Sequence, residues 1–124
     1  EKEELENVLK IHKGNAGFGD SAKMVIIVTS DLRTFTSVGE RYQNYIDGSL
    51  FGMSLIYALH SFGLATCTLN WSVTKKADKQ MHALVEIPEY EAIVFLIVVG
   101  HYPKTFRVAK SKRQDINNVM QIKE

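Results

Sequence analysis

The sequence predicts a fold of mixed α and β class, and two apolar runs are the main observation behind this prediction. Residues 22–30 contain the run MVIIVT, and residues 92–99 contain the run IVFLIVV. Continuous β-branched runs of this length are typical of strands buried on both faces of a sheet. Sheets buried in that way are covered by helices on both sides, and the segments between these runs have the apolar spacing of helices.

Composition indicates one soluble globular domain over residues 1–124. Hydrophobic residues make up 45% of the chain and charged residues 23%, which is enough apolar material for a core and argues against intrinsic disorder. The formal net charge of +1 provides no broad positive field for nucleic acid or an anionic membrane. The basic residues of the C-terminal tail suit a small anionic ligand better; they are Lys104, Arg107, Lys110, Lys112, Arg113 and Lys123.

The N-terminal part of the chain predicts a short helix followed by a loop. Within residues 2–12, the apolar side chains recur at helical spacing, and Gly14 is placed to end the helix. The following segment, GNAGFGDS over residues 14–21, is turn-rich. Its glycines have the order GxxGxG, precede a strand instead of a helix and lack a following Lys-Ser or Lys-Thr. We therefore interpret it as a plain turn and not as a phosphate-binding loop.

A longer helix is expected over residues 41–62, with apolar side chains on nearly all of its sides. Such a helix must be buried, and a chain this small offers few internal partners for it. A homodimer is the simplest solution. Gly48, Gly52 and Ala58 provide small surfaces that the backbone of a partner could approach closely, and packing within the chain alone is the alternative.

The remaining elements follow in order. Gly63 closes the long helix, and ATCTLNW over residues 65–71 predicts a short strand that ends in a turn. Thr74 is a suitable N-cap for a helix over residues 75–85, which Pro88 follows. Beyond Gly100 the tail is basic and then weakly helical in pattern.

Motifs that would carry catalysis by side chains are absent from the sequence. The four histidines have no metal-ligand spacing, so independent structural or surface roles are expected and no metal is predicted. Cys67, the single cysteine, lies in an apolar run and is expected to be a buried neutral thiol. With no disulfide, no leader and no membrane-spanning run, the expected location is the cytoplasm.

Three stretches together resemble the C-terminal half of the nitroreductase family of flavoproteins. The first is DGSLFGMSLIYALHSFGLATCTLNWS, residues 47–72, which is similar to the family's long central helix, turn and short strand. The second is LVEIPEYEAIVFLIVVGHYP, residues 84–103, and the third is the basic tail around VAKSKR, residues 108–113. The segment VGERYQ from Val38 adds to the match, which covers nearly the whole chain.

The resemblance implies a three-layer α-β-α fold of the α+β class, with a mixed or antiparallel sheet flanked by helices in a homodimer. It implies FMN as cofactor, NAD(P)H as reductant, and a nitro, quinone or related small-molecule electron acceptor. The turn Leu69, Asn70 and Trp71 would lie against the isoalloxazine ring, with Ser72 adjacent. Lys110, Lys112 and Arg113 would hold the FMN phosphate, and a solvated basic tail is the alternative for these three residues.

Two flavin-contacting motifs of the family have no counterpart in residues 1–21: an Arg-Arg-Ser-type segment and a Pro-Ser-x-x-Asn-like turn. The resemblance therefore implies a domain that is incomplete at its N-terminus. It leaves a second hypothesis open, a truncated relative that keeps the dimer core as a scaffold and no longer binds flavin.

Overall fold

The computed structural model describes residues 2–107 and 110–123, and its centre is an antiparallel sheet of three strands. The strands are β1, Met24–Asp31, β2, Leu64–Asn70, and β3, Glu91–His101, in the spatial order β1-β3-β2. Both neighbours pair antiparallel with β3, through Val25 opposite Val98 on one side and Cys67 opposite Val98 on the other. The mixed α and β class predicted from the apolar runs is confirmed.

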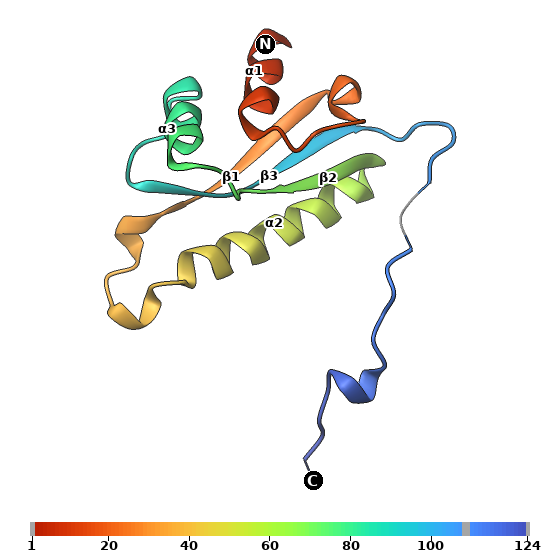
Figure 1. The fold of residues 1–124 in the computed structure, drawn as a ribbon. Coiled ribbons are helices and arrows are strands. Elements are labelled where there is room, and N and C mark those ends of the chain that lie inside the picture. The colour runs from red at the N-terminus through yellow and green to blue at the C-terminus, as the bar shows by residue number, and fades with distance from the viewer. Residues whose placement is uncertain (1, 108–109, 124) are drawn as a thin grey trace.

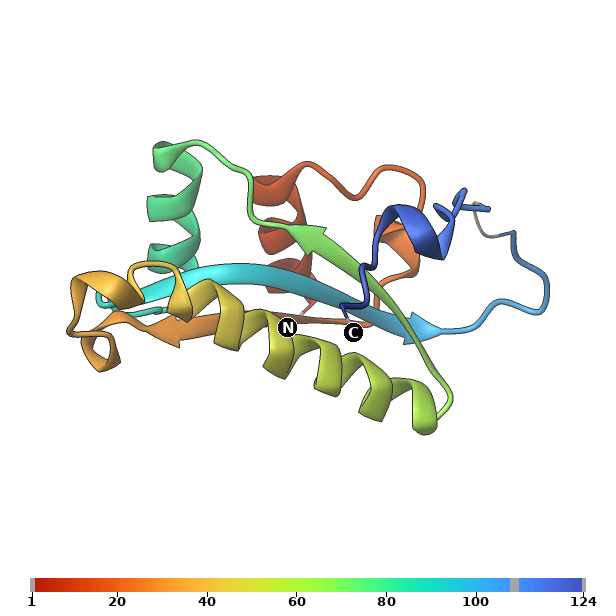
Figure 2. The ribbon, with the colours of Figure 1, turned by 90° about the horizontal axis from the view of Figure 1, so that it is seen from below.

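Helices cover both faces of the sheet, which gives the three-layer α-β-α arrangement that the resemblance implied. Helices α1, Lys2–His12, and α3, Lys75–Leu84, lie on one face, and α2, Gln43–Ser61, runs along the other (Figure 1). The view from below shows α2 along the length of the sheet (Figure 2). Thr74 caps α3 as expected, because its side chain accepts a hydrogen bond from the backbone N–H of Ala77 at 3.3 Å.

Side chains of β3 contribute to two separate cores, one on each face of the sheet, and they alternate between the faces except at an irregularity in the pairing with β1 between Ile93 and Phe95. Ile93, Leu96 and Val98 are buried in the core beneath α1 and α3, together with Met81 of α3, which is fully buried. Ile97 and Val99 belong to the core beneath α2. The expectation that residues 92–99 form a strand buried on both faces is confirmed by these five side chains.

The other two strands are less buried than their sequences suggested. Residues 22–30 were expected to be covered on both faces, but within β1 only Val28 is buried. Cys67 was expected to be a buried thiol, and in the single chain it is exposed. Both differences have one cause: β1 and β2 are the edges of a three-stranded sheet, so only β3 has a neighbouring strand on each side.

The helix expected over residues 41–62 spans Gln43–Ser61 and is far from buried within the single chain. Its outward surface is rich in exposed large apolar side chains, among them Tyr45, Ile46, Leu50, Phe51, Met53 and Tyr57. Gly48 and Gly52, however, were expected to admit a partner, and here the expectation is wrong: both are buried against the chain's own β3. Ala58 is exposed.

The connecting segments have little regular structure, both in the glycine-rich loop and in the polar tail. Residues 14–21 form turns that end in the short 3-10 helix Gly19–Ser21, as the plain-turn interpretation predicted. In the tail, regular structure among the described residues is limited to one 3-10 turn, Ile116–Asn118, so the weakly helical pattern produces very little helix. Across the described chain, no helix has the length and apolar character needed to cross a membrane.

Candidate functional site

An open hollow of about 610 Å³ lies where α2, the end of β2 and the segment after α1 meet. Its size is in the range typical of small-molecule sites. Phe95 of β3 forms part of its lining. The other lining residues are His12 at the end of α1, Gly14 after it, Ser49, Met53 and Ile56 of α2, and Thr68, Leu69 and Asn70 of β2.

His12 fixes the end of β2 from outside the sheet. Its Nε2 lies 2.6 Å from the carbonyl oxygen of Asn70, and its Nδ1 lies 3.0 Å from the backbone nitrogen of Gly14. A backbone N–H can only donate and a carbonyl oxygen can only accept. Nδ1 is therefore the acceptor and Nε2 carries the hydrogen, so these two bonds select one neutral tautomer of His12.

The four residues expected at the ring of the flavin are brought together only in part. Leu69 and Asn70 line the hollow, although the Leu69 side chain is 6% exposed and packs into the core beneath α1 and α3. Trp71 is half-buried next to the hollow. Its Nε1 donates a hydrogen bond to Asp78 of α3 at 2.7 Å, and its ring lies 6.0 Å from the ring of His12. Ser72 is exposed.

The cations expected at the phosphate are not brought to the hollow. Lys110, Lys112 and Arg113 are exposed, and the described part of the tail leads away from the sheet after β3 (Figure 1). Val108 and Ala109 of the same predicted segment lie outside the described residues. Among the described residues that line the hollow there is no Lys or Arg.

Sequence reasoning missed most of the lining. His12 had been expected to have an independent structural or surface role, and Gly14 had been interpreted as a helix terminator and as part of a plain turn. Ser49, Met53 and Ile56 lie at spacings of four and three residues, so they share a face of α2. That spacing alone does not distinguish a binding surface from the core, which is why the contribution of α2 was not foreseen.

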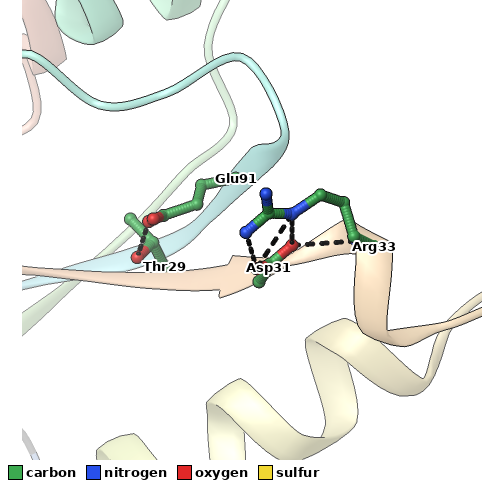
Figure 3. A network of polar contacts seen from close by, with 4 residues as sticks. All are labelled: Thr29, Asp31, Arg33 and Glu91. Carbon is green, nitrogen blue, oxygen red and sulfur yellow. Dashed lines mark hydrogen bonds and ion pairs between the residues drawn. The ribbon is translucent and has the colours of Figure 1, made fainter.

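A separate polar network lies at the end of β1, outside the hollow (Figure 3). The Arg33 guanidinium donates to Asp31 in a forked geometry, with Nη2 2.6 Å and Nε 3.0 Å from the carboxylate oxygens, and it stacks 3.6 Å above the Tyr90 ring. Hydrogen bonds from the Arg33 side chain and backbone lower the pKa of Asp31, and the same pair raises the pKa of Arg33. Next to it, Thr29 donates to Glu91 at 2.6 Å. The Thr29–Glu91 hydrogen bond joins β1 to β3.

In the described part of the chain, no cluster of three or more His, Cys, Asp or Glu side chains is arranged to hold a metal. Besides His12, two other histidines make contacts within the fold: His60 Nδ1 lies 2.9 Å from the hydroxyl of Tyr102, and His82 Nδ1 lies 3.2 Å from the carbonyl oxygen of Ile87. The chemistry available at the hollow is therefore that of a binding site with aromatic, amide and hydroxyl groups.

The fold and the site together define the class of protein: a three-layer α-β-α protein with an open hollow between its long helix and its sheet. Residues 1–101 match the Nitroreductase family, and the chain belongs to this family. The matched region contains the first helix and the glycine loop as well as the three strands, whereas the tail from residue 102 onward lies beyond it. No curated protein matches the chain.

Several solved structures have a fold similar to that of this chain. The FMN-dependent nitroreductase of Clostridium difficile R20291 has a TM-score of 0.69 at 18% identity, with 95% of this chain and 65% of that chain covered. NfrA1 of B. megaterium has a TM-score of 0.76 at 17% identity, covering 98% and 53%. A nitroreductase with bound FMN from Bacteroides fragilis NCTC 9343 has a TM-score of 0.66 at 17% identity, covering 97% and 71%. The chain thus spans about half to two thirds of the length of the first two.

Proposed function

We propose that this chain forms the flavin-contacting part of an FMN-dependent oxidoreductase, which takes electrons from NAD(P)H and passes them to a nitro, quinone or related small-molecule acceptor. The observation that carries the proposal is the hollow at the end of β2, where Leu69 and Asn70, the residues expected at the flavin ring, meet α2. Membership of the nitroreductase family and the likeness to a fold that binds FMN in a relative support it.

The residues at the hollow fit one part of FMN, its ring system. A flavin ring is a flat aromatic body with a polar edge, and the lining offers apolar surface from Met53, Ile56 and Phe95 together with polar groups from Thr68 and Asn70. The hollow has no cationic side chain for the FMN phosphate, since none of its described lining residues is a Lys or Arg. We assign the phosphate to Lys110, Lys112 and Arg113 of the tail, which the single chain does not bring to the hollow.

When bound, FMN supplies the acceptance and release of electrons, and the role of the protein is to hold the ring and control access to it. Asn70 and the backbone after it orient the polar edge of the ring, and Ser72 lies adjacent as a further polar group. Met53 and Ile56 exclude water from the face toward α2. No acid-base side chain is assigned, because the cofactor carries the redox chemistry and the protons that the acceptor takes up can come from solvent.

The proposed assembly is a homodimer formed through the outward surface of α2. Leu50, Phe51 and Tyr57 are 62–66% exposed in the single chain, and Tyr45, Ile46 and Met53 of the same helix are exposed as well. Large exposed apolar patches of this kind mark interaction sites. Because Ser49 and Met53 of the same helix line the open hollow, a partner on this surface would also narrow the opening.

Titration with FMN tests the proposal, and Trp71 is a convenient probe because it is the single tryptophan and lies next to the hollow. We expect FMN to quench Trp71 emission saturably and to remain bound through gel filtration. Asn70→Ala should weaken binding about fivefold or more, as expected for one lost hydrogen bond. The control Asn118→Ala changes an exposed asparagine in the tail and should bind as the wild type does. A protein that neither quenches nor retains FMN would overturn the proposal and favour the non-catalytic dimer scaffold.

A further inference from the structure

We propose that His12 is a positioning residue of the hollow, which holds the Asn70–Ser72 backbone in the conformation that receives the ligand. The inference rests on the proposed function in taking FMN as the ligand, but its structural part concerns the protein without ligand. Neither the sequence motifs nor the resemblance assigned His12 any part in the site.

The two hydrogen bonds of His12 join segments that are otherwise far apart in the chain. Nε2–H donates to the carbonyl of Asn70, 58 residues away, while Nδ1 accepts from the N–H of Gly14, two residues away. The Gly14 bond orients the imidazole, and the oriented imidazole holds the last residue of β2. β2 is an edge strand, so its end beyond Asn70 has no further strand to fix it.

Trp71 extends the same connection. Its ring packs against His12 at 6.0 Å between centroids, tilted by 32°, and its Nε1 is bound to Asp78 of α3. The backbone from Asn70 to Trp71 is thus held on one side by the end of α1 and on the other by α3. A ligand that contacts this backbone meets a preorganised surface, and preorganisation lowers the free-energy cost of binding.

Gly14 is required for this arrangement on steric grounds. A Cβ at this position would lie 2.5 Å from Cε1 and 2.7 Å from Nδ1 of His12. Any other residue would therefore push the imidazole away from its bonds. Because the His12 side chain can rotate, Gly14→Ala should displace the ring without unfolding the protein. This substitution provides a second route to the same defect that leaves His12 itself unchanged.

Two conservative variants test the two hydrogen bonds of His12 one at a time. In His12→Gln, the amide nitrogen can take the place of Nε2 and donate to Asn70. In His12→Asn, the amide oxygen can take the place of Nδ1 and accept from Gly14, but nothing reaches Asn70. If His12 has a positioning role, the His12→Gln variant should behave like the wild type and the His12→Asn variant should not. His101→Asn is the matched control, since His101 is an exposed histidine at the far end of β3.

The first readout uses the protein without FMN. Amide hydrogen exchange of the Asn70–Val73 segment should become about fivefold faster or more in His12→Asn and in Gly14→Ala, and stay within about twofold of the wild type in His12→Gln and His101→Asn. Equal exchange in His12→Asn and the wild type would overturn the proposal. This result does not depend on FMN, so a failure here is distinguishable from failure of the proposed function.

The second readout is FMN affinity. His12→Asn and Gly14→Ala should each weaken binding about fivefold or more, and the double variant should be no worse than either single one, because both remove the same contact. Fully additive losses would contradict the shared mechanism. Faster exchange in the variants with unchanged FMN affinity would overturn the positioning role. An equal loss of FMN affinity in His12→Gln and in His12→Asn would also overturn it, because the imidazole ring itself, and not its hydrogen bond to Asn70, would then be what matters.

Discussion

Gly52 of α2 faces the ring of Phe95 on β3 so closely that a Cβ at this position would lie 2.0 Å from Phe95 Cζ. One turn earlier, a Cβ on Gly48 would lie 2.7 Å from Val94 Cγ2. The two glycines therefore bring α2 onto the sheet of its own chain. Phe95 also lines the hollow, so the helix-sheet contact and the candidate site share a side chain.

Gly52→Ala should destabilise the protein. Overpacking a well-filled core costs about 1–3 kcal/mol, whereas alanine in place of glycine inside a helix contributes only about 0.5–1 kcal/mol. We expect a net loss of about 1–2 kcal/mol in the free energy of unfolding, measured by urea denaturation. The control Ser54→Ala, on the exposed side of α2, should be neutral or slightly stabilising. Stability of Gly52→Ala at or above the wild-type value would contradict the close approach.

A charge on the outward surface of α2 should dissociate the proposed dimer. Phe51 is 62% exposed in the single chain, and Phe51→Glu would bury an unpaired carboxylate in the interface. Light scattering coupled to gel filtration should show a dimer for the wild type and a monomer for Phe51→Glu. Val38→Glu, which changes an 83% exposed valine in the 3-10 turn before α2, should remain dimeric. A monomeric wild type at micromolar concentration would refute the assembly.

Removal of two tail cations tests the phosphate assignment. The double variant Lys112→Ala/Arg113→Ala should weaken FMN binding about tenfold, because charge-assisted hydrogen bonds to phosphate are among the stronger polar contacts. Riboflavin, which lacks the phosphate, should bind both proteins alike. Lys75→Ala/Lys76→Ala removes the same charge from exposed positions of α3 and is the control. If FMN and riboflavin respond identically, the tail has no specific part in phosphate binding.

The Asp31–Arg33 pair predicts a pH dependence of stability. Because the pKa of Asp31 is lowered in the folded protein, its contribution is fully present above the pKa of the unfolded chain and is lost as pH falls through the lower folded-state pKa. The melting temperature of the wild type should exceed that of Asp31→Asn at about pH 7, and the two should converge toward about pH 2. Asp20→Asn, at an exposed aspartate outside this network, is the control. A difference that persists unchanged at low pH would contradict the assignment.

The parts of the fold that follow from local pattern were predictable from the sequence. The run before Gly100 forms the central strand, and Thr74 caps α3, because burial and capping depend on neighbouring residues. The burial of β1 and of Cys67 was mispredicted, since an apolar run does not reveal whether its strand is central or at an edge. Gly48 was assigned to a partner for a similar reason: a small residue marks a close approach but not which chain approaches.

The candidate site was predictable only where consecutive residues form it. Leu69 and Asn70 came from the motif at the end of β2, and both line the hollow. His12 and Phe95 are separated from this motif by tens of residues in the chain, and they meet it only after the sheet has formed and α1 has packed on it. No spacing rule connects positions joined in this way, so the hydrogen bond from His12 to Asn70 required the folded structure.

Visible absorption of the purified protein with FMN under anaerobic conditions, before and after addition of NADH or NADPH, is the sharpest test of electron transfer through FMN. We expect FMN to stay with the protein after dialysis, its visible band to be bleached by either nucleotide, and a nitro compound or a quinone then to restore the band. A protein that remains colourless after incubation with FMN and dialysis would refute the proposed function.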